Sequence, residues 1–496
     1  MRGQKPWIPD QAGDDRKKSG DDSFEASLTI SIPMTDWEMK QPKKKHKNSP
    51  SVSSSQLSKW DRQYVWHPFT QMKEWEQEDP LIIEKGEGIY LYDTHGNKYL
   101  DGSSSIWVNL HGHGHCTLDT AIQDQLRKIA HSTLLGAASP PSIILAKELV
   151  KIAPRGLTRV FYSDDGSTAV EVALKMAIQY WQQQNPPQKK KKTFVRLDVA
   201  YHGDTVGSMS VGGIALFHER FRPLLFSAIT LDAPYCYRCP LHLRFPSCRT
   251  ACLDPLEDVL ARRHEQIAGV IIEPMVQAVA GIITQPPGYL SRVRALCTKY
   301  NVLLIADEVA TGFGRTGTMF ACDHERVTPD LLCVAKGLTG GYLPLAATLT
   351  TENVYQAFLG EPEKTFFHGH SYTGNALGCA AALANLEIFK KEKTLVQVGK
   401  RSRMLQTLLE PLAESPIVGD VRQCGMMAGI ELVKNKETRE PFPLSERMGY
   451  RLAAECRRRG LLIRPIGNIV VFVPPLATTE RELRKMLSIL TKACRT

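Results

Sequence analysis

Residues 301–309 have the sequence NVLLIADEV, and residues 329–337 have the sequence PDLLCVAKG. Each stretch contains an almost unbroken apolar run that leads to a charged side chain, Asp307 in the first and Lys336 in the second. Runs of Val, Ile and Leu without polar alternation are typical of parallel strands that helices cover on both faces. Because ligands of such sheets lie beyond the carboxyl ends of the strands, Asp307 and Lys336 are candidate site residues.

Two further apolar runs, TRVFYS at 158–163 and AGVIIEP at 268–274, alternate with helical stretches along the chain. This alternation predicts an α/β fold whose large domain, 116–375, has a mostly parallel sheet covered by helices. After residue 376 the pattern changes to helical stretches and short strands such as LLIRPI and NIVVFVPPL. We therefore predict a smaller α+β domain at 376–496.

Short apolar runs between residues 81 and 100 are separated by glycine and by the turn signal His95-Gly96-Asn97. They predict small strands joined by hairpins. We expect them to belong to an N-terminal segment, 61–115, that packs with the small domain.

The first sixty residues, 1–60, mix Asp, Lys, Ser, Gly and Pro with few periodic apolar positions, which predicts a disordered tail. Part of the formal net charge of +10 lies here, in the basic run from Lys43 to Lys47. Serines follow that run, which favours a solvated tail over a nucleic-acid-binding arm. Met34 and Met39 are possible alternative starts, so whether the tail belongs to the native product stays open.

The composition, with 43% hydrophobic and 23% charged residues, is that of a globular protein and excludes collagen-like, coiled-coil and wholly disordered chains. No stretch approaches the roughly 18 uncharged apolar residues of a membrane-spanning helix, and the first thirty residues lack the apolar region of a secretion signal. We therefore expect a cytoplasmic protein with no membrane partner. Its 12 cysteines are expected to be reduced thiols.

A lysine and an aspartate at the ends of neighbouring strands suit the cofactor pyridoxal 5'-phosphate (PLP). Its aldehyde needs a lysine amine, and its ring nitrogen needs a carboxylate to stay protonated. An anion site for the phosphate is expected at 163–177, SDDGSTAVEVALKMA. There a strand ends, Gly166 and Ser167 allow close backbone approach, and a helix begins whose N-terminal amides attract an anion.

These motifs resemble those of one enzyme family. The segments that carry the resemblance are ADEVATGFGRTG (306–317), CVAKGLTGGYLP (333–344), YHGDT (201–205), SDDGSTAVEVALKMA and HGHSYTGN (368–375). Together they are similar to the class III branch of fold-type I aminotransferases, over about residues 60 to 490. The resemblance implies a PLP-dependent homodimer that transfers amino groups between small molecules.

The resemblance also implies roles for individual residues. Lys336 would bind PLP covalently and act as the catalytic base and acid, and Asp307 would face the ring nitrogen. The remaining implied roles are Gly166 and Ser167 at the phosphate, Tyr201 against the ring and the substrate, His370 and Ser371 at the phosphate of the partner subunit, and Trp107, Gly369 and Arg464 at the substrate.

Within the class, VWHPFTQM (65–72), YHGDTVGSMSVG and LIRPIGN are most similar to the branch that converts 8-amino-7-oxononanoate to 7,8-diaminononanoate for biotin. In that branch Arg464 would pair the far carboxylate of the keto acid, a task suited to a planar bidentate donor. Ile106 and Phe69 stand where some members have Trp and Tyr near the substrate. Adenosylmethionine and lysine therefore both stay open as amino donors.

Other functions remain to be weighed against this one. Another class III ω-aminotransferase or an aminomutase would share the same motifs, and a non-catalytic PLP-fold binding protein would share the fold. Gly312, Gly314 and Gly317 form a GxGxxG pattern, but no convincing helix follows, which disfavours a dinucleotide site.

Two groups of metal-ligand residue types occur in the sequence. His111, His113 and His115 alternate with glycines, which favours a flexible loop over a zinc site. Four cysteines are spaced C-x2-C-x8-C-x3-C, which could hold zinc or an iron–sulfur centre. They are Cys236, Cys239, Cys248 and Cys252. Because the interval between the pairs is short for a zinc ribbon, we expect an extended loop without metal.

Overall fold

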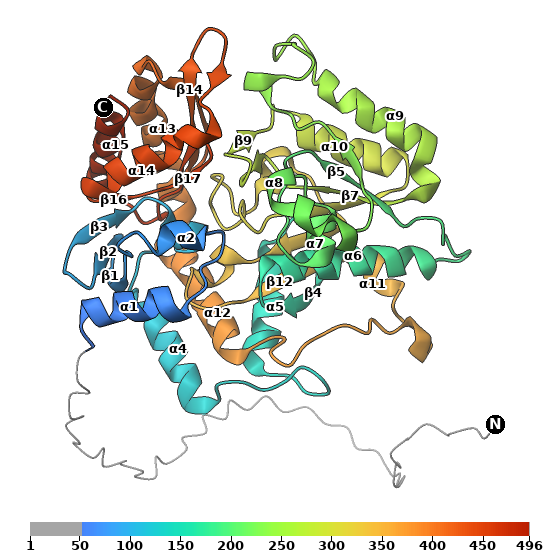
Figure 1. Cartoon of the computed structure of the whole chain (residues 1–496). Helices are drawn as coiled ribbons and strands as arrows, with labels where there is room; N and C mark the ends of the chain where they lie inside the picture. Colours follow the sequence, from blue (N-terminus) through green and yellow to red (C-terminus); the bar gives the residue numbers. More distant parts are fainter. Residues whose placement is uncertain (1–51, 496) are drawn as a thin grey trace, which may run out of the picture.

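The computed structural model describes residues 52–495 (Figure 1). The predicted disordered tail, 1–60, lies outside the described residues up to residue 51. For its last residues the prediction is wrong, because helix α1 spans Ser54–Tyr64. The side chain of Ser53 accepts a hydrogen bond from the backbone N–H of Gln56 at 3.2 Å and so caps this helix. Ser54 Oγ donates to the carbonyl oxygen of Thr94 at 3.1 Å. Two serines of the predicted tail therefore start the helix and attach it to the fold.

The centre of the molecule is a seven-stranded sheet with the strand order β4-β12-β11-β10-β7-β5-β6. Only β12 runs antiparallel to its neighbours, so the predicted mostly parallel sheet is confirmed. The strands are β4 (Leu157–Ser163), β12 (Ala346–Thr351), β11 (Leu331–Val334), β10 (Leu303–Asp307), β7 (Ile267–Ile272), β5 (Thr193–Leu197) and β6 (Ile229–Leu231).

Strand β10 shows why these strands lack polar alternation. Leu303 and Ile305 belong to the apolar cluster formed with helix α6 (Gly166–Gln182). Leu304 and Ala306, which point to the opposite face, belong to the cluster that contains residues of helices α5 (Pro140–Ile152) and α10 (Tyr289–Lys299). All four side chains are buried, because helices cover the sheet on both faces (Figure 1).

Helices surround this sheet and extend into the C-terminal part of the chain. The longer ones are α4 (Cys116–Lys128), α5 (Pro140–Ile152), α6, α9 (Asp254–Arg263), α10 (Tyr289–Lys299), α12 (Ala376–Lys391), α13 (Thr394–Leu409), α14 (Met448–Arg458) and α15 (Glu480–Ala493). The predicted domain boundary at 376 falls at the start of α12, which packs mainly on α4 and α5. This helix therefore lies with the larger unit.

Two smaller sheets complete the C-terminal and N-terminal parts. One has the order β13-β14-β18-β17, with β15 paired to β14. The other, β1-β2-β3-β16, joins the two ends of the chain, because Leu100 of β3 pairs in parallel with Leu461 of β16 (Figure 1). Their strands are β1 (Ile83–Glu87), β2 (Tyr90–Asp93), β3 (Lys98–Asp101), β13 (Val418–Cys424), β14 (Met427–Asn435), β15 (Glu440–Pro441), β16 (Leu461–Leu462), β17 (Arg464–Ile466) and β18 (Ile469–Phe472).

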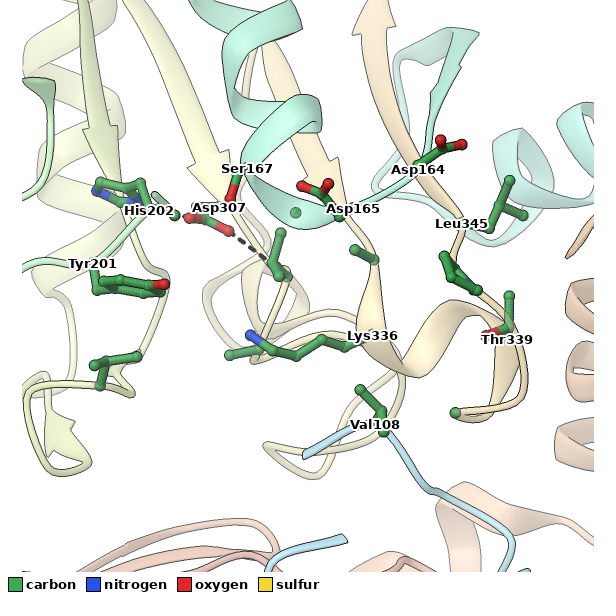
Figure 2. A pocket seen from close by; sticks show the side chains of 18 of the residues that line it. Val108, Asp164, Asp165, Ser167, Tyr201, His202, Asp307, Lys336, Thr339 and Leu345 are labelled. Atoms are coloured by element: carbon green, nitrogen blue, oxygen red, sulfur yellow. Dashed lines mark hydrogen bonds and ion pairs between the residues drawn. The ribbon is translucent and has the colours of Figure 1, made fainter. Parts of the chain in front are cut away.

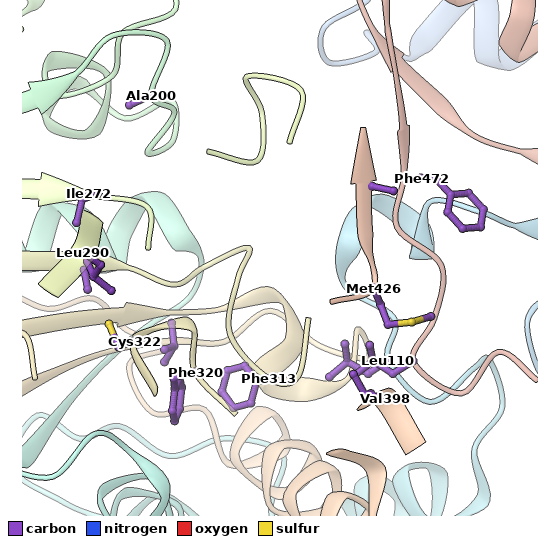
Figure 3. Close-up of a cluster of buried hydrophobic side chains, with 14 of the residues drawn as sticks. Leu110, Ala200, Ile272, Leu290, Phe313, Phe320, Cys322, Val398, Met426 and Phe472 are labelled. Carbon is purple, nitrogen blue, oxygen red and sulfur yellow. The ribbon is translucent and has the colours of Figure 1, made fainter. Parts of the chain in front are cut away.

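A continuous hydrophobic core connects these parts (Figure 3). It runs from Ile272 and Leu290 beside the central sheet, through Phe313, to Met426 and Phe472 of the C-terminal sheet region. All five side chains are buried. Because buried apolar area is the main stabilising contribution to folding, the two units are held together by the same core that holds each of them.

Candidate active site

A cavity of about 450 Å³ opens at the carboxyl ends of β7, β10 and β11 (Figure 2). Its volume lies in the range of small-molecule sites, and its position is where ligands bind to parallel sheets. Several of the predicted site residues line it. They are Gly166, Ser167, Tyr201, Asp307 and Lys336.

Lys336 follows strand β11 and reaches into this cavity (Figure 2). Its backbone has φ +40°, a conformation that non-glycine residues rarely adopt and that often occurs at functional sites. Burial lowers the pKa of Lys336, and the nearby carboxylates of Asp307 and Glu273 oppose this shift. A lowered pKa increases the fraction of neutral amine, which is the form that attacks a carbonyl carbon.

Asp307 ends strand β10, and two groups hold its carboxylate. Its Oδ2 lies 2.6 Å from Nδ1 of His202, and its Oδ1 accepts a hydrogen bond from the backbone N–H of Val309 at 3.0 Å. Both side chains are buried. Nε2 of His202 is also buried and has no hydrogen-bond partner among the described residues. His202 therefore fixes the orientation of Asp307 toward the cavity.

Glu273 is a site residue that the sequence analysis missed. It follows strand β7, lines the cavity, and accepts hydrogen bonds from the backbone N–H groups of Tyr201 at 3.2 Å and Ala278 at 2.8 Å. Burial raises the pKa of Glu273 to about 7. Asp307 was a candidate because it ends an apolar strand. Glu273 also follows an apolar run, so the sequence contained the signal for this residue too.

The N-terminus of α6 forms a close cradle beside the cavity. Asp165 caps the helix by accepting a hydrogen bond from Thr168 N at 3.0 Å. A Cβ on Gly166 would lie 2.5 Å from a methyl carbon of Val309, so a side chain does not fit there. Backbone amides at such an N-terminus are suited to an anion such as phosphate.

Tyr201 lies on one wall of the cavity (Figure 2). Its hydroxyl donates to Asp204 Oδ2 at 2.6 Å, and burial raises the pKa of this hydroxyl. Its ring meets Phe217 edge-on with 6.2 Å between centroids, and Phe217 in turn meets Phe69 at 5.1 Å. These three rings form an aromatic row that leads away from the cavity.

The other predicted site residues do not line this cavity. Trp107 lies beside it, with Nζ of Lys336 5.3 Å from the ring centroid. Arg464 is exposed on β17, and Gly369 and Ser371 are exposed in the loop before α12. His370 Nδ1 lies 3.5 Å from Oδ2 of Asp164, which does line the cavity. The roles predicted for these residues remain predictions.

The remaining motifs have structural surroundings of their own. Gly312, Gly314 and Gly317 lie in turns, and the element that follows is the short 3₁₀ helix Ala321–Glu325. His111 is bonded to Asn385 at 2.7 Å and His113 to Asp101 at 3.2 Å. Within residues 52–495, no three or more His, Cys, Asp and Glu side chains are placed to hold a metal ion. None of the helices in this range is long and apolar enough to cross a membrane.

The residues of this cavity fit PLP. An amine, a buried carboxylate and an anion cradle without a side chain converge on it, and these are the three features that the cofactor requires. Lys336 would hold its aldehyde carbon, Asp307 its ring nitrogen, and the amides at Gly166 and Ser167 its phosphate. When bound, PLP withdraws electrons from the amine-bearing carbon of the substrate. The fold and this site thus define a PLP-dependent transferase of fold type I.

Comparison with known proteins leads to the family. The model of the family "Aminotransferase class-III" matches residues 71–494. The chain belongs to the class III aminotransferases, and the predicted fold class, enzyme class and cofactor are confirmed.

Two curated relatives cover nearly the whole described chain. The adenosylmethionine-8-amino-7-oxononanoate aminotransferase of Geobacter sulfurreducens is 50% identical over 450 residues, which are 90% of this chain and 99% of the relative. The enzyme of the same name from Aquifex aeolicus is 53% identical over 437 residues, which are 88% of this chain and 96% of the relative.

Solved structures agree with this result. The adenosylmethionine-8-amino-7-oxononanoate aminotransferase of Methanocaldococcus jannaschii superimposes with a TM-score of 0.85 at 48% identity, covering 89% of this chain and 99% of that one. An (S)-enantioselective omega-transaminase from Thermomicrobium roseum has the same TM-score at 34% identity, covering 89% and 98%. The fold is therefore shared with transaminases of other specificity.

Proposed function

We propose that this enzyme converts 8-amino-7-oxononanoate to 7,8-diaminononanoate in biotin biosynthesis, with adenosylmethionine as the amino donor. The observation that carries the proposal is the identity of about half of all residues with relatives of that name over about nine tenths of the chain. The convergence of Lys336 and Asp307 on one cavity supports transamination as the reaction. The cytoplasmic location expected from the sequence remains a prediction.

The residues of the cavity account for the proton and charge movements of such a reaction. Nζ of Lys336 removes the proton from the amine-bearing carbon of the donor, and in the second half-reaction it supplies a proton to the carbon that receives the amine. Asp307, held by His202, stabilises positive charge at the ring nitrogen of the cofactor. The ring of Tyr201 limits the position of the substrate on one side.

The alternative within the class III aminotransferases is a general ω-aminotransferase. The 34% identity to the omega-transaminase of Thermomicrobium roseum is the observation that favours it. Turnover of 8-amino-7-oxononanoate, measured with adenosylmethionine and lysine as competing donors, distinguishes the alternatives. We expect product formation with adenosylmethionine in preference to lysine. Preference for lysine would overturn the proposed donor, and no turnover of the keto acid with either donor would overturn the proposed substrate.

Arg464 tests the proposed keto acid at the level of one residue. We expect Arg464→Ala to raise the KM for 8-amino-7-oxononanoate by about thirty-fold or more, because losing a charge-assisted partner of a carboxylate costs about 2 kcal/mol or more where the bound substrate excludes water from the pair. The arginine is exposed, so the variant should fold normally. Separate rates of the two half-reactions give the measurement.

Arg464→Lys is the matched control, because it keeps the charge and loses the bidentate geometry. Its KM should lie between those of the wild type and Arg464→Ala. If Arg464→Ala leaves the keto-acid half-reaction unchanged, the assignment of this arginine to the substrate carboxylate is wrong.

We further propose that the enzyme acts as a homodimer. His370 and Ser371 lie in the loop 368–375. The aromatic side chains of Tyr372 in this loop and of Phe367 just before it are 59% and 79% exposed. We expect sedimentation to give a dimer at assay concentrations, with His370 and Ser371 close to the phosphate site of the partner subunit. A fully active monomer would contradict the roles assigned to both residues.

A further inference from the structure

The segment 232–253 connects β6 to α9 and contains the four cysteines outside the active site. Its only regular structure consists of the three-residue 3₁₀ turns Cys236–Arg238 and Ala251–Leu253. Connections of this length without secondary structure are uncommon in compact domains and are usually either functional or linker segments. None of the four cysteines forms a disulfide in the structure.

The four thiols nevertheless gather at one place. They line a single small cavity with a volume of about 20 Å³. Cys252 lies within electrostatic range of the three others, and Cys236 within range of Cys239 and Cys248. The C-x2-C and C-x3-C pairs, which are separated in the sequence by eight residues, are thus brought together by the fold.

The size of the cavity selects among possible occupants. A volume of about 20 Å³ exceeds only slightly the roughly 10–15 Å³ that one water-sized sphere requires. The space between the thiols therefore admits a single small ion. Pro240, Leu241 and Phe245 supply apolar walls, as is common around structural metal sites.

The charge of the segment also suits a tetrathiolate. Arg238, Arg244 and Arg249 lie between Cys236 and Cys252, and the same interval contains no Asp or Glu. A divalent ion bound by four thiolates carries a net charge of −2, which the guanidinium groups of this basic segment would favour and the carboxylate of Asp420, close to Cys236, would oppose. Zinc with four cysteine ligands, two of them in a C-x2-C pair, is a common structural centre.

We propose that Cys236, Cys239, Cys248 and Cys252 form a structural zinc site. Binding replaces four S–H bonds by four S–Zn bonds and releases four protons to solvent, without any change of oxidation state. The side chains are not yet placed to hold a metal in the structure. All four lie in the coil and short turns of this segment, and the proposed site requires their sulfur atoms to come closer together than they are in the structure.

The position of the segment indicates what the zinc would stabilise. Arg238 Nε donates to Oε1 of Glu431 on β14 at 2.6 Å, and its NH1 donates to the carbonyl oxygen of Arg439 at 2.8 Å. At the other end of the segment, NH1 of Arg292 on α10 donates a hydrogen bond to the carbonyl oxygen of Thr250 at 3.0 Å. The segment therefore bridges the central sheet unit and the C-terminal sheet, and a zinc cross-link would fix that bridge.

The test is metal analysis of the full-length holoenzyme, purified under reducing conditions from cells supplied with zinc. We expect about one zinc per chain in the wild type and in Cys116→Ser, a control at an exposed cysteine outside the segment, and less than about 0.1 in the double variant Cys236→Ser/Cys239→Ser. Zinc retained by the double variant would overturn the site. Stoichiometric iron in place of zinc would overturn the choice of metal.

Two measurements on the wild type keep the test decisive if the double variant does not fold. Chelator-treated enzyme reloaded with Co²⁺ should show the intense visible bands of tetrahedral thiolate coordination. Zinc should protect four cysteines from a thiol reagent, and peptide mapping should identify them as those of segment 232–253. Absence of these bands, four freely reactive thiols in the presence of zinc, or disulfides among the four would each overturn the proposal.

Discussion

Lys336→Ala is expected to lower kcat by more than about 10³-fold, because one side chain serves both as the attachment point of the cofactor and as the proton carrier, and positioned acid–base groups alone contribute about 10²–10⁴-fold. The amine comes directly after strand β11 and reaches into the cavity that Asp307 also lines. Neighbouring side chains cannot replace it. Steady-state turnover of the purified variant gives the measurement.

The chemical assignment of Lys336 has an independent readout. Borohydride reduction should fix PLP to Lys336 in the wild type, as peptide mapping would show, and to no residue in Lys336→Ala. Lys299→Ala is the matched control, since the ammonium of Lys299 on α10 forms an exposed ion pair with Glu257 on α9. That variant should keep wild-type turnover and labelling. A label on any other lysine of the wild type would refute the assignment.

The sheet could be predicted because the sequence pattern and the burial have the same cause. Side chains on both faces of β10 are covered by helices, so the strand is apolar up to its last residue, where the cavity begins. This is why Asp307 and Lys336 stood out. Glu273 likewise follows a buried apolar strand, β7, and lines the cavity, so the same pattern predicts it as a site residue.

Other parts of the site depend on tertiary contacts that the sequence does not display. His202 belongs to the motif YHGDT, but only the fold brings its Nδ1 to 2.6 Å from Oδ2 of Asp307. The segment Ser104–Trp107 adopts positive φ values from +47° to +67° without any glycine. Such a left-handed turn has no signal in the residues Ser-Ser-Ile-Trp, and yet it sets the position of Trp107 beside Lys336.

The error at the N-terminus has a similar origin. Serines are ambiguous in a sequence, because they are frequent both in disordered chains and at helix N-caps. The polarity of Ser53 and Ser54 favours the predicted tail. In the structure Ser53 caps α1, and Ser54 donates a hydrogen bond to the carbonyl oxygen of Thr94. The distinction depends on whether a partner such as Thr94 is near, which composition cannot show.

Asp307→Asn is expected to lower kcat by about 10²- to 10³-fold, equivalent to about 3–4 kcal/mol of transition-state stabilisation, with little effect on folding. The amide has nearly the same shape and can still bond Nδ1 of His202 and the backbone N–H of Val309. It carries no negative charge, so it cannot keep the ring nitrogen of the cofactor protonated. The electron withdrawal that stabilises negative charge on the substrate carbon is then lost.

The variant separates this electrostatic role from a structural one. Bound PLP, measured by absorbance after release, and the unfolding temperature should stay near the wild-type values while kcat falls. Asp258→Asn on α9, where the carboxylate is exposed, should change neither quantity nor kcat. If Asp307→Asn instead keeps wild-type turnover, Asp307 does not contact the ring nitrogen, and Glu273, the other buried carboxylate of the cavity, becomes the candidate for that contact. In that case Glu273→Gln, and not Asp307→Asn, would show the loss of kcat, because the proton on the ring nitrogen needs one buried anion to hold it.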